Sequence, residues 1–512
     1  MEVPRTGVKS PRTSGQAWLA RVWDGRAVPV LRDLKTAWHD PAVKRGVLGS
    51  CLLFVGSLSP AYLPQSSPLW APMRALGLDN WPVPVVETVA AVVAVALIVE
   101  AWLRLRHVVY VRIKHWAVGV WWSLPLLAAP PVFSHDAYGY AAEGWLLRNG
   151  LSPYENAISV LPGPFADQAA WVWRYDTAMY PPLSLRMFEG MVVVGGQDPY
   201  WSTLAMRIPA LVGVALIWYY LPRIARRIGV DAAFTAWLAA INPLLLIDLV
   251  GGMHNDALMM GLVVTALWLA LNGRFWVAAV VVGVAASIKQ PALLAAFPVA
   301  MLGHPWRSWA WRDTSRALVR LAASFGVTIG VFVGISFVSG LGFGWVNAAA
   351  VPGKIVNPAP VTMIAAGVRW LLAGAGGVGA GDVAYETIRA AGLALSFAVI
   401  AALALTVGRR RPITLLCWGY LVFAFGGLAL NSWYLTWGGA LLPLARPSER
   451  TVSAAVIVTA ISLVFEAGYL AWRNDAFALG FAGLVLMGAI VWYDMIRRGQ
   501  ATAARGREVA HA

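Results

Sequence analysis

The chain has 512 residues, of which 59% are hydrophobic and 13% charged, and its formal net charge is +15. This apolar fraction exceeds what a soluble core of this length needs and predicts a membrane protein. The basic residues lie in short clusters between apolar runs, which argues against nucleic-acid binding, and Cys51 and Cys417 are the only cysteines, so neither a disulfide framework nor a cysteine metal site is expected.

A basic arm over residues 1–45 opens the chain. Apolar residues between Trp18 and Leu34 alternate with Arg and Lys, which predicts a helix lying on an anionic membrane surface. The first apolar run begins near Gly46, too far from the amino terminus for a cleavable signal, so we expect it to remain as a membrane anchor.

Apolar runs long enough to cross a bilayer then follow along most of the chain. They cover residues 46–63, 84–103, 116–133, 203–222, 232–250, 255–271, 317–338, 386–407, 413–430, 451–471 and 476–493. Residues 275–303 are interrupted by Lys289-Gln290-Pro291 and predict two short helices, and 433–444 adds one more crossing. The sequence therefore predicts an all-α polytopic membrane protein with about fourteen transmembrane helices.

Roughly three quarters of the Lys and Arg residues face the cytoplasm if the amino terminus lies inside, so both termini are predicted to be cytoplasmic, with a basic tail over 494–512. The catalytic domain would then cover 46–493. Residues 134–202 and 340–385 become long extracytoplasmic loops, where function is expected. Within the first loop, 183–195 predicts an interfacial helix.

The first long loop opens with Ser134-His135-Asp136-Ala137-Tyr138-Gly139-Tyr140, followed by Glu143. A carboxylate beside aromatic rings at the lipid boundary can accept a proton from a sugar hydroxyl, which makes Asp136 the candidate catalytic base. The alternative is that Asp136 only caps a helix over 137–148. Tyr138, Tyr140 and Glu143 are candidate sugar-binding residues.

A second polar segment joins two later spans on the same side, after a break at Asn242-Pro243. His254, Asn255 and Asp256 offer donors and acceptors suited to sugar hydroxyls, although a tight turn followed by a helix cap would use the same residues. Lys289 interrupts an apolar run, where an ammonium needs an anion or water. We expect it to bind a phosphate, with snorkelling to the interface as the alternative.

Four further candidates lie near predicted outer helix ends. Arg207 is one of them, and Tyr180, Trp433 and Tyr434 could stack on sugars or pack on prenyl chains, although aromatic residues also populate membrane interfaces. The sequence has no phosphate-cradling glycine loop and no zinc or calcium ligand spacing, so it predicts no metal site and no cofactor and leaves a metal requirement open. An activated donor would then be lipid-linked.

At these positions the chain resembles the actinobacterial polyprenol-phosphomannose-dependent α-1,6-mannopyranosyltransferases, the MptA and MptB group of the GT-C glycosyltransferases. The matching segments are SHDAYGYAAEGWLLRNGLSPY (134–154), MYPPLSL (179–185), NPLLLIDLVGGMHNDALMMGL (242–262), IKQPALLAAFP (288–298) and NSWYLTWGGALLPLA (431–445). Their order and spacing agree over most of the chain. Asp248, where relatives are expected to have a histidine, and the segment 155–178 depart from the pattern.

The resemblance implies transfer of mannose from polyprenyl-phosphate mannose, at the outer leaflet of the inner membrane, to the α-1,6-mannan of lipomannan and lipoarabinomannan. It implies that Asp136 is the base of an inverting reaction, that Lys289 with Arg207 stabilises the departing phosphate, and that His254, Asn255 and Asp256 hold donor or acceptor.

Three alternatives stay open. A transporter or flippase predicts polar residues near the bilayer midplane, often in inverted halves. A scaffold subunit of an envelope-synthesis complex predicts no dependence on Asp136. A protein O-mannosyltransferase of the same class would use a Ser or Thr side chain as its acceptor.

Overall fold

The computed structural model describes residues 29–80, 82–348, 351 and 357–511, and every regular element within that part of the chain is helical. Residues 1–28, which hold most of the predicted basic arm, lie outside the described residues. Residues 29–38 form a helix, and the Leu34 carbonyl in it accepts a hydrogen bond of 2.9 Å from Trp121 Nε1.

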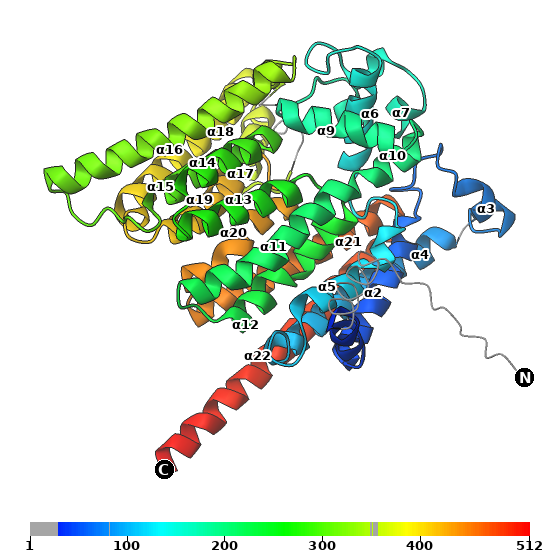
Figure 1. The fold of residues 1–512 in the computed structure, drawn as a ribbon. Helices are drawn as coiled ribbons and strands as arrows, with labels where there is room; N and C mark the ends of the chain where they lie inside the picture. Colours follow the sequence, from blue (N-terminus) through cyan, green and yellow to red (C-terminus); the bar gives the residue numbers. More distant parts are fainter. Residues whose placement is uncertain (1–28, 81, 349–350, 352–356, 512) are drawn as a thin grey trace, which may run out of the picture.

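Most helices run along one bundle, and a smaller group gathers at one end of it (Figure 1). The bundle contains α2 (Pro41–Ser57), α4 (Val83–Arg104), α5 (His115–Ser123), α11 (Arg207–Arg227), α12 (Ala232–Thr235), α13 (Asp256–Leu271), α14 (Phe275–Ile288), α15 (Ala296–Met301), α16 (Trp311–Val338), α17 (Pro360–Gly374), α18 (Val378–Leu403), α19 (Pro412–Gly426), α20 (Leu435–Leu441), α21 (Glu449–Arg473) and α22 (Phe477–His511). The end group contains α6 (Asp136–Arg148), α7 (Pro164–Gln168), α8 (Trp171–Arg174), α9 (Pro182–Val194) and α10 (Pro199–Ala205), and α3 (Trp70–Ala75) lies in the α2–α4 connection.

Six helical segments of the described chain are long and apolar enough to cross a membrane, or seven if one bent pair is a single span. They are Val83–His107, Pro199–Arg227, Trp311–Val338, Val378–Gly408, Glu449–Arg473 and Phe477–Arg498. The protein is therefore a multi-pass membrane protein. The predicted count of fourteen is not confirmed, because several other apolar helices, among them α13, α14 and α19, have only 10–17 residues.

The predicted interruptions of two apolar runs are confirmed. Ala232–Ala240 and Leu245–Gly251 are bent by 52° around Asn242-Pro243, where proline cannot donate to the preceding turn. At Lys289 the backbone becomes extended (φ −154°, ψ 128°), which ends α14 before a 3₁₀ segment over Gln290–Ala295 continues into α15. Both breaks leave polar groups inside the bundle.

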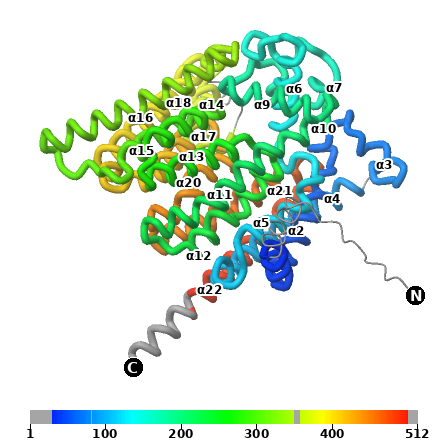
Figure 2. The backbone as a smooth tube through the Cα atoms, in the orientation of Figure 1, coloured from blue at the N-terminus to red at the C-terminus, as the bar shows by residue number. Residues whose placement is uncertain are grey.

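The two predicted outer loops differ in structure. Residues 134–202 fold into α6 to α10 around a small apolar cluster that includes Tyr140, Phe165 and Phe188, and the predicted interfacial helix is α9. The predicted loop 340–385 instead contains α17 and the start of α18, which pack on each other and belong to the bundle (Figure 2). Alanine and leucine in α17 favour helix where its glycines indicated a loop.

Helices α11 and α13 approach each other closely through two glycines. A Cβ built on Gly213 would lie 2.1 Å from the Ala257 backbone, and one on Gly261 would lie 2.5 Å from the Gly213 carbonyl oxygen. Such small-residue contacts let helix backbones pack directly, which is a usual way for membrane helices to associate. The contact fixes the start of α13, where Asp256 lies.

We expect Gly213→Ala to lower the free energy of unfolding by about 1–3 kcal/mol, because the added methyl has no space between the two backbones. The measurement is unfolding in detergent. The matched control is Gly330→Ala in α16, where a Cβ would meet nothing within 4 Å; it should be neutral or stabilising by up to about 1 kcal/mol. Equal effects of the two variants would contradict close packing at Gly213.

Candidate active site

Asp136 is the first residue of α6, but its carboxylate does not cap that helix. The N-cap position is His135, no side-chain cap bond is made, and the Asp136 backbone N–H donates to Ser134 Oγ at 3.1 Å. The Asp136 side chain is instead 15% exposed, and its Oδ2 lies 3.6 Å from His254 Nδ1. The capping interpretation of Asp136 is therefore wrong, and its carboxylate is available for chemistry.

His254 is placed by a tight turn after the bent span. Met253 has a positive φ of 60°, and a Cβ on Gly252 would lie 2.6 Å from the Asp248 carbonyl oxygen, so the turn needs glycine at that position. The His254 ring is 1% exposed and stacks on Trp433 with centroids 3.7 Å apart. His254 therefore forms a rigid wall behind the Asp136 carboxylate.

Lys289 and Asp256 form a buried ion pair at the same end of the bundle. Lys289 Nζ donates to Asp256 Oδ2 at 2.7 Å, and Trp437 Nε1 donates to Oδ1 of the same carboxylate at 2.7 Å. The ammonium also lies 5.1 Å from the Tyr434 ring centroid and 6.0 Å from that of Tyr180. Snorkelling is therefore the wrong interpretation of Lys289, since an anion and aromatic rings surround its ammonium.

Hydrogen bonds tie the end group of helices to the break after α14. Asn255 Nδ2 donates to Ser184 Oγ at 3.2 Å, and Ser184 Oγ donates to the Ile288 carbonyl at 2.8 Å. Gln290 Nε2 donates to the Met179 carbonyl at 3.1 Å. These contacts hold α9, the start of α13 and the Lys289 break in one fixed arrangement.

Arg207 lies close to the site but is occupied by backbone carbonyls. Its guanidinium is 3% exposed, and it donates to the carbonyls of Val250 (3.0 Å) and Gly251 (3.4 Å) and to those of Leu127 (2.8 Å) and Ala129 (2.8 Å). Four of the five donors of an arginine are thus used inside the protein. The arrangement does not support phosphate binding by Arg207; it joins the segment before Asp136 to the turn before His254.

A polar pocket opens beside Asp136 on the α6 side. Glu143, Trp173 and Tyr180 line it together with Asp136, and Glu143 Oε2 is a buried oxygen with no hydrogen-bond partner. Asp136 and Glu143 share one face of α6, with Gly139 between them. Two carboxyl groups and an indole ring on one wall form a surface suited to sugar hydroxyls and to the apolar face of a sugar ring.

The remaining predicted tyrosines separate into two positions. Tyr140 lines the polar pocket and lies edge-on to Tyr180, with centroids 5.2 Å apart. Tyr138 is fully buried and does not line the pocket; its electrostatic neighbours are Tyr200 and Arg207. The structure thus brings Tyr140 to the candidate site and places Tyr138 in the packing between α6 and α10.

The environment of Asp136 favours its neutral form more than water does. The pKa of Asp136 is raised to about 6, mainly because the carboxyl group is buried. The positive charge of Lys289 lowers this pKa, the negative charge of Asp256 raises it, and a hydrogen bond from Trp173 lowers it. Burial, with a smaller contribution from Asp136, also raises the pKa of Glu143 well above its usual value. Asp136 can thus exchange a proton near neutral pH, as a general base must.

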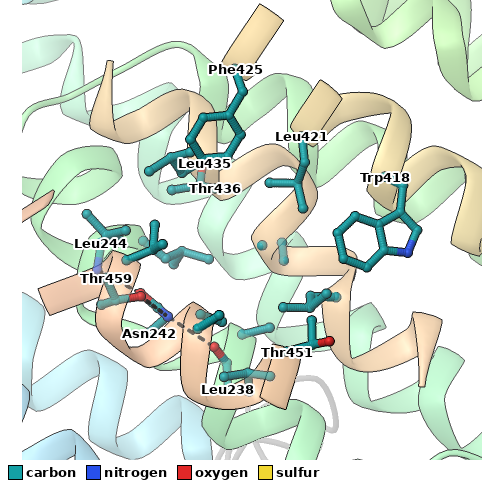
Figure 3. Close-up of a pocket in the computed structure, with 18 residues that line it drawn as sticks. Leu238, Asn242, Leu244, Trp418, Leu421, Phe425, Leu435, Thr436, Thr451 and Thr459 are labelled. Carbon is teal, nitrogen blue, oxygen red and sulfur yellow. Dashed lines mark hydrogen bonds between the residues drawn. The ribbon is translucent and has the colours of Figure 1, made fainter. Parts of the chain in front are cut away.

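An apolar cavity of about 230 Å³ lies in the bundle (Figure 3). Its wall includes Leu435 and Thr436, which lie between the site residues Tyr434 and Trp437 in the chain, and continues over Leu421 and Phe425 of α19. The Asn242–Thr459 hydrogen bond of 3.3 Å is one of the few polar contacts there. The cavity can accommodate hydrocarbon.

The sequence did not predict a role in the site for three of its residues. Trp437, Trp173 and Ser184 are apolar or unremarkable in sequence, and only their spacing to known motifs, such as Trp437 four residues after Trp433, could have marked them. Asp248, whose role the sequence left open, is buried close to Glu466, which accepts a hydrogen bond of 2.9 Å from Ser432 Oγ. Neither carboxyl group lines the polar pocket.

Within the described residues, no group of three or more His, Cys, Asp or Glu side chains is arranged to hold a metal ion. The candidate site thus consists of a proton acceptor, a buried cation and aromatic walls. A helical membrane bundle with this site at one end has the features of a membrane-embedded enzyme.

Comparison with known proteins agrees with this class. Residues 43–304 match the family described as alpha-(1->6)-mannopyranosyltransferase, N-terminal domain. The chain is 29% identical to alpha-(1->6)-mannopyranosyltransferase A of Mycobacterium tuberculosis, over 88% of this chain and 89% of the relative. It is 30% identical to a probable alpha-(1->6)-mannopyranosyltransferase of Mycolicibacterium smegmatis, over 82% and 81%. A second Mycobacterium tuberculosis relative of that activity is 31% identical, over 70% and 69%.

The chain therefore belongs to the alpha-(1->6)-mannopyranosyltransferase family, as its motifs predicted. It is a glycosyltransferase, and its relatives support mannosyltransferase activity.

We expect Lys289→Met to lower the free energy of unfolding by about 3–5 kcal/mol, because it leaves the Asp256 carboxylate buried without its cation. Adding Asp256→Asn should restore part of the loss. Unfolding in detergent measures both.

The matched control is Arg369→Met, which breaks an ion pair of 2.7 Å to Asp382 whose side chains are 53% and 54% exposed. That loss should stay below about 1 kcal/mol. If Lys289→Met lowered the free energy of unfolding as little as the control does, the Lys289–Asp256 pair would stabilise the bundle no more than an exposed ion pair.

Proposed function

We propose that this protein transfers mannose from polyprenyl-phosphate mannose to the 6-hydroxyl of an α-1,6-mannan of the lipomannan and lipoarabinomannan type. The observation that carries the proposal is the proximity of a carboxylate with a pKa raised to about 6, Asp136, to the Lys289–Asp256 pair within aromatic walls. The first supplies a base, and the second places a cation for a phosphate.

In the proposed reaction, Asp136 removes the proton of the acceptor 6-hydroxyl. The hydroxyl oxygen forms a bond to C1 of the donor mannose, while the bond from C1 to the phosphate oxygen breaks and its electron pair leaves with the polyprenyl phosphate. The donor mannose is β-linked and the product α-linked, so one displacement inverts C1. Polyprenyl phosphate is a good leaving group, and no general acid is needed.

Lys289 is proposed to stabilise the phosphate charge that develops on departure. Only one of the three donors of an ammonium is used by Asp256 in the structure, so two remain for phosphate oxygens. Asp256 and Trp437 hold the ammonium in place. Arg207 has no such part in this proposal and acts through the backbone segments that it joins.

The sugar-binding roles are assigned by position. Glu143, Tyr140 and Tyr180 line the polar pocket and are proposed to hold the acceptor sugar beside Asp136. His254 and Trp433 form the wall behind the base. Tyr434, next to Lys289, and Asn255, whose Oδ1 is a buried acceptor with no hydrogen-bond partner, are proposed to face the donor mannose.

The lipid part of the donor has a matching surface. The apolar cavity in Figure 3 is lined by Leu435 and Thr436, which follow Tyr434 in the chain, and it would accommodate the first isoprene units beyond the phosphate. The positive-inside distribution of Lys and Arg supports an extracytoplasmic site in the inner membrane, with both termini in the cytoplasm. A soluble nucleotide donor has no hydrocarbon chain that would occupy this cavity.

We expect Asp136→Asn to lower the rate of mannose transfer by about 10²-fold or more, since an amide cannot accept the proton. The assay follows labelled mannose from polyprenyl-phosphate mannose onto a short α-1,6-mannoside, using membranes with equal amounts of folded protein. The control, Asp167→Asn, removes a carboxylate of the same end group whose side chain is 68% exposed and should leave the rate unchanged.

Normal transfer by Asp136→Asn would remove this residue from the mechanism. A parallel assay with a Ser- and Thr-containing peptide tests the acceptor. Transfer to the peptide but not to the mannoside would assign a protein O-mannosyltransferase, and uptake or release of the lipid without transfer would assign a transporter.

We expect the transfer rate of the wild-type protein to fall with decreasing pH around pH 6. Burial raises the Asp136 pKa to about 6, so protonation removes the base below this pH, and the rate should drop about tenfold per pH unit once the pH is well below the pKa. Above it, the rate should level off. A rate independent of pH from about 5 to about 8 would contradict a base with this pKa.

A further inference from the structure

A second polar cavity lies at the opposite end of α14 from Lys289. It has a volume of about 630 Å³ and is formed by residues 303–307, after α15, and by the first turns of α16. Arg320 of α16 lies over the ring of Phe275, the first residue of α14, at 4.7 Å. Since α14 has 14 residues, the cavity is roughly 20 Å from the candidate active site. We call it the arginine pocket.

The arginine pocket is built on one face of α16. Asp313, Arg316, Ala317 and Arg320 follow an i, i+3, i+4, i+7 pattern and therefore lie on one side of the helix. Ala317 is 4% exposed and packs in a small cluster with Trp306, and its short side chain leaves room between the two arginines. Arg307 closes the opposite wall.

Positive charge in the arginine pocket exceeds negative charge. Three arginines line it, Arg307, Arg316 and Arg320, against one carboxylate, and that carboxylate, Asp313, accepts a hydrogen bond of 2.6 Å from Ser308. Among the described residues no ion pair neutralises any of the three arginines. Arg320 Nε donates to the Ala300 carbonyl at 2.9 Å, which fixes one arginine in the wall.

A neighbouring basic segment increases this excess. The Arg409 guanidinium lies 4.4 Å from the Trp309 ring centroid, and the Trp306 backbone N–H donates to the Arg409 carbonyl at 3.0 Å. Arg410 Nη2 donates to the Arg307 carbonyl at 3.4 Å. The loop between α15 and α16 is therefore held against residues 409–411, which bring further positive charge to the same surface.

Several other arginines at this end of the bundle are paired with carboxylates. Arg45 and Arg104 both contact Glu100, Arg498 lies 2.8 Å from Asp494, and Arg106 lies 3.4 Å from Glu449. Basic residues that only mark the cytoplasmic side need no cavity and no deficit of carboxylates. The arginine pocket has both, and its three arginines, unlike Arg45, Arg104 and Arg498 in the cavity beside α4, have no carboxylate paired with them among the described residues.

The depth of the arginine pocket matches the lipid headgroups. Trp309 and Trp311 are 59% and 81% exposed at its edge, and tryptophan favours the membrane interface. The apolar part of α16 begins directly after Arg320. A ligand in the pocket would therefore lie at the phosphate level of the bilayer, with its hydrocarbon chains along the exposed apolar face of α16, where Val319 is 68% exposed.

From this arrangement we propose that the arginine pocket binds the phosphodiester headgroup of an anionic membrane phospholipid. Arginine offers several donors in a planar fork that fits phosphate oxygens, and basic pockets between membrane helices bind such headgroups. Arg307 and Arg316 contact the phosphate from the two walls, and Arg320 is fixed beneath it. The proposal is independent of the reaction at the other end of the bundle.

The test measures the unfolding midpoint of the full-length protein in neutral detergent as phosphatidylglycerol or phosphatidylcholine is added. The variant is Arg307→Gln with Arg316→Gln, both exposed, so the fold should persist. The matched control is Arg226→Gln with Arg227→Gln, two exposed arginines in the last turn of α11 that carry the same total charge.

We expect phosphatidylglycerol, but not phosphatidylcholine, to raise the midpoint of the wild-type and control proteins. The pocket variant should need about tenfold or more phosphatidylglycerol for half of the effect, because it has lost two of the phosphate contacts. Equal weakening of the variant and the control would overturn the proposal, since net charge alone would then explain the effect. Equal responses to the two lipids would also overturn it. A full shift with inorganic phosphate alone would assign the pocket to a soluble anion and overturn the lipid assignment.

Discussion

The buried ammonium of Lys289 is the constraint around which the candidate active site is organised. A lysine inside an apolar bundle is costly unless an anion meets it, and Asp256 does so at 2.7 Å. Because Trp437 binds the second oxygen of the same carboxylate, three segments from distant parts of the chain converge on one point. The extended backbone at Lys289, which ends α14, allows its side chain to enter this space.

A second set of constraints is the repeated interruption of helices at the same end of the bundle. Proline bends the span before His254, and glycine permits the turn that follows. The carbonyl groups freed by these breaks need donors, and Arg207 supplies them to Gly251 and to Ala129. The arginine thus fixes the distance between the segments that carry Asp136 and His254, although its own charge lies behind the site.

The two ends of the bundle use positive charge differently. At the end with Asp136, the buried ammonium of Lys289 is neutralised by Asp256 and lies near aromatic rings. At the other end the arginine pocket has three arginines against one carboxylate. One lysine in low dielectric affects nearby titrating groups such as Asp136, whereas exposed arginines act through contacts with mobile anions. The two groups of positive charge therefore lie at opposite ends of α14.

Composition, apolar runs and local motifs determined the helical membrane class, the interruptions at Pro243 and Lys289, the family and the candidate status of Asp136, because hydropathy and backbone chemistry act locally. The number of spans could not be predicted from the sequence, because several apolar helices have only 10–17 residues and are too short to cross a bilayer. Only the tertiary structure decided that Arg207 serves the backbone, that Tyr138 faces α10, and that Trp437 binds Asp256. Those outcomes depend on which donor and acceptor meet across the bundle, and burial leaves each polar group with the partner that packing brings near it.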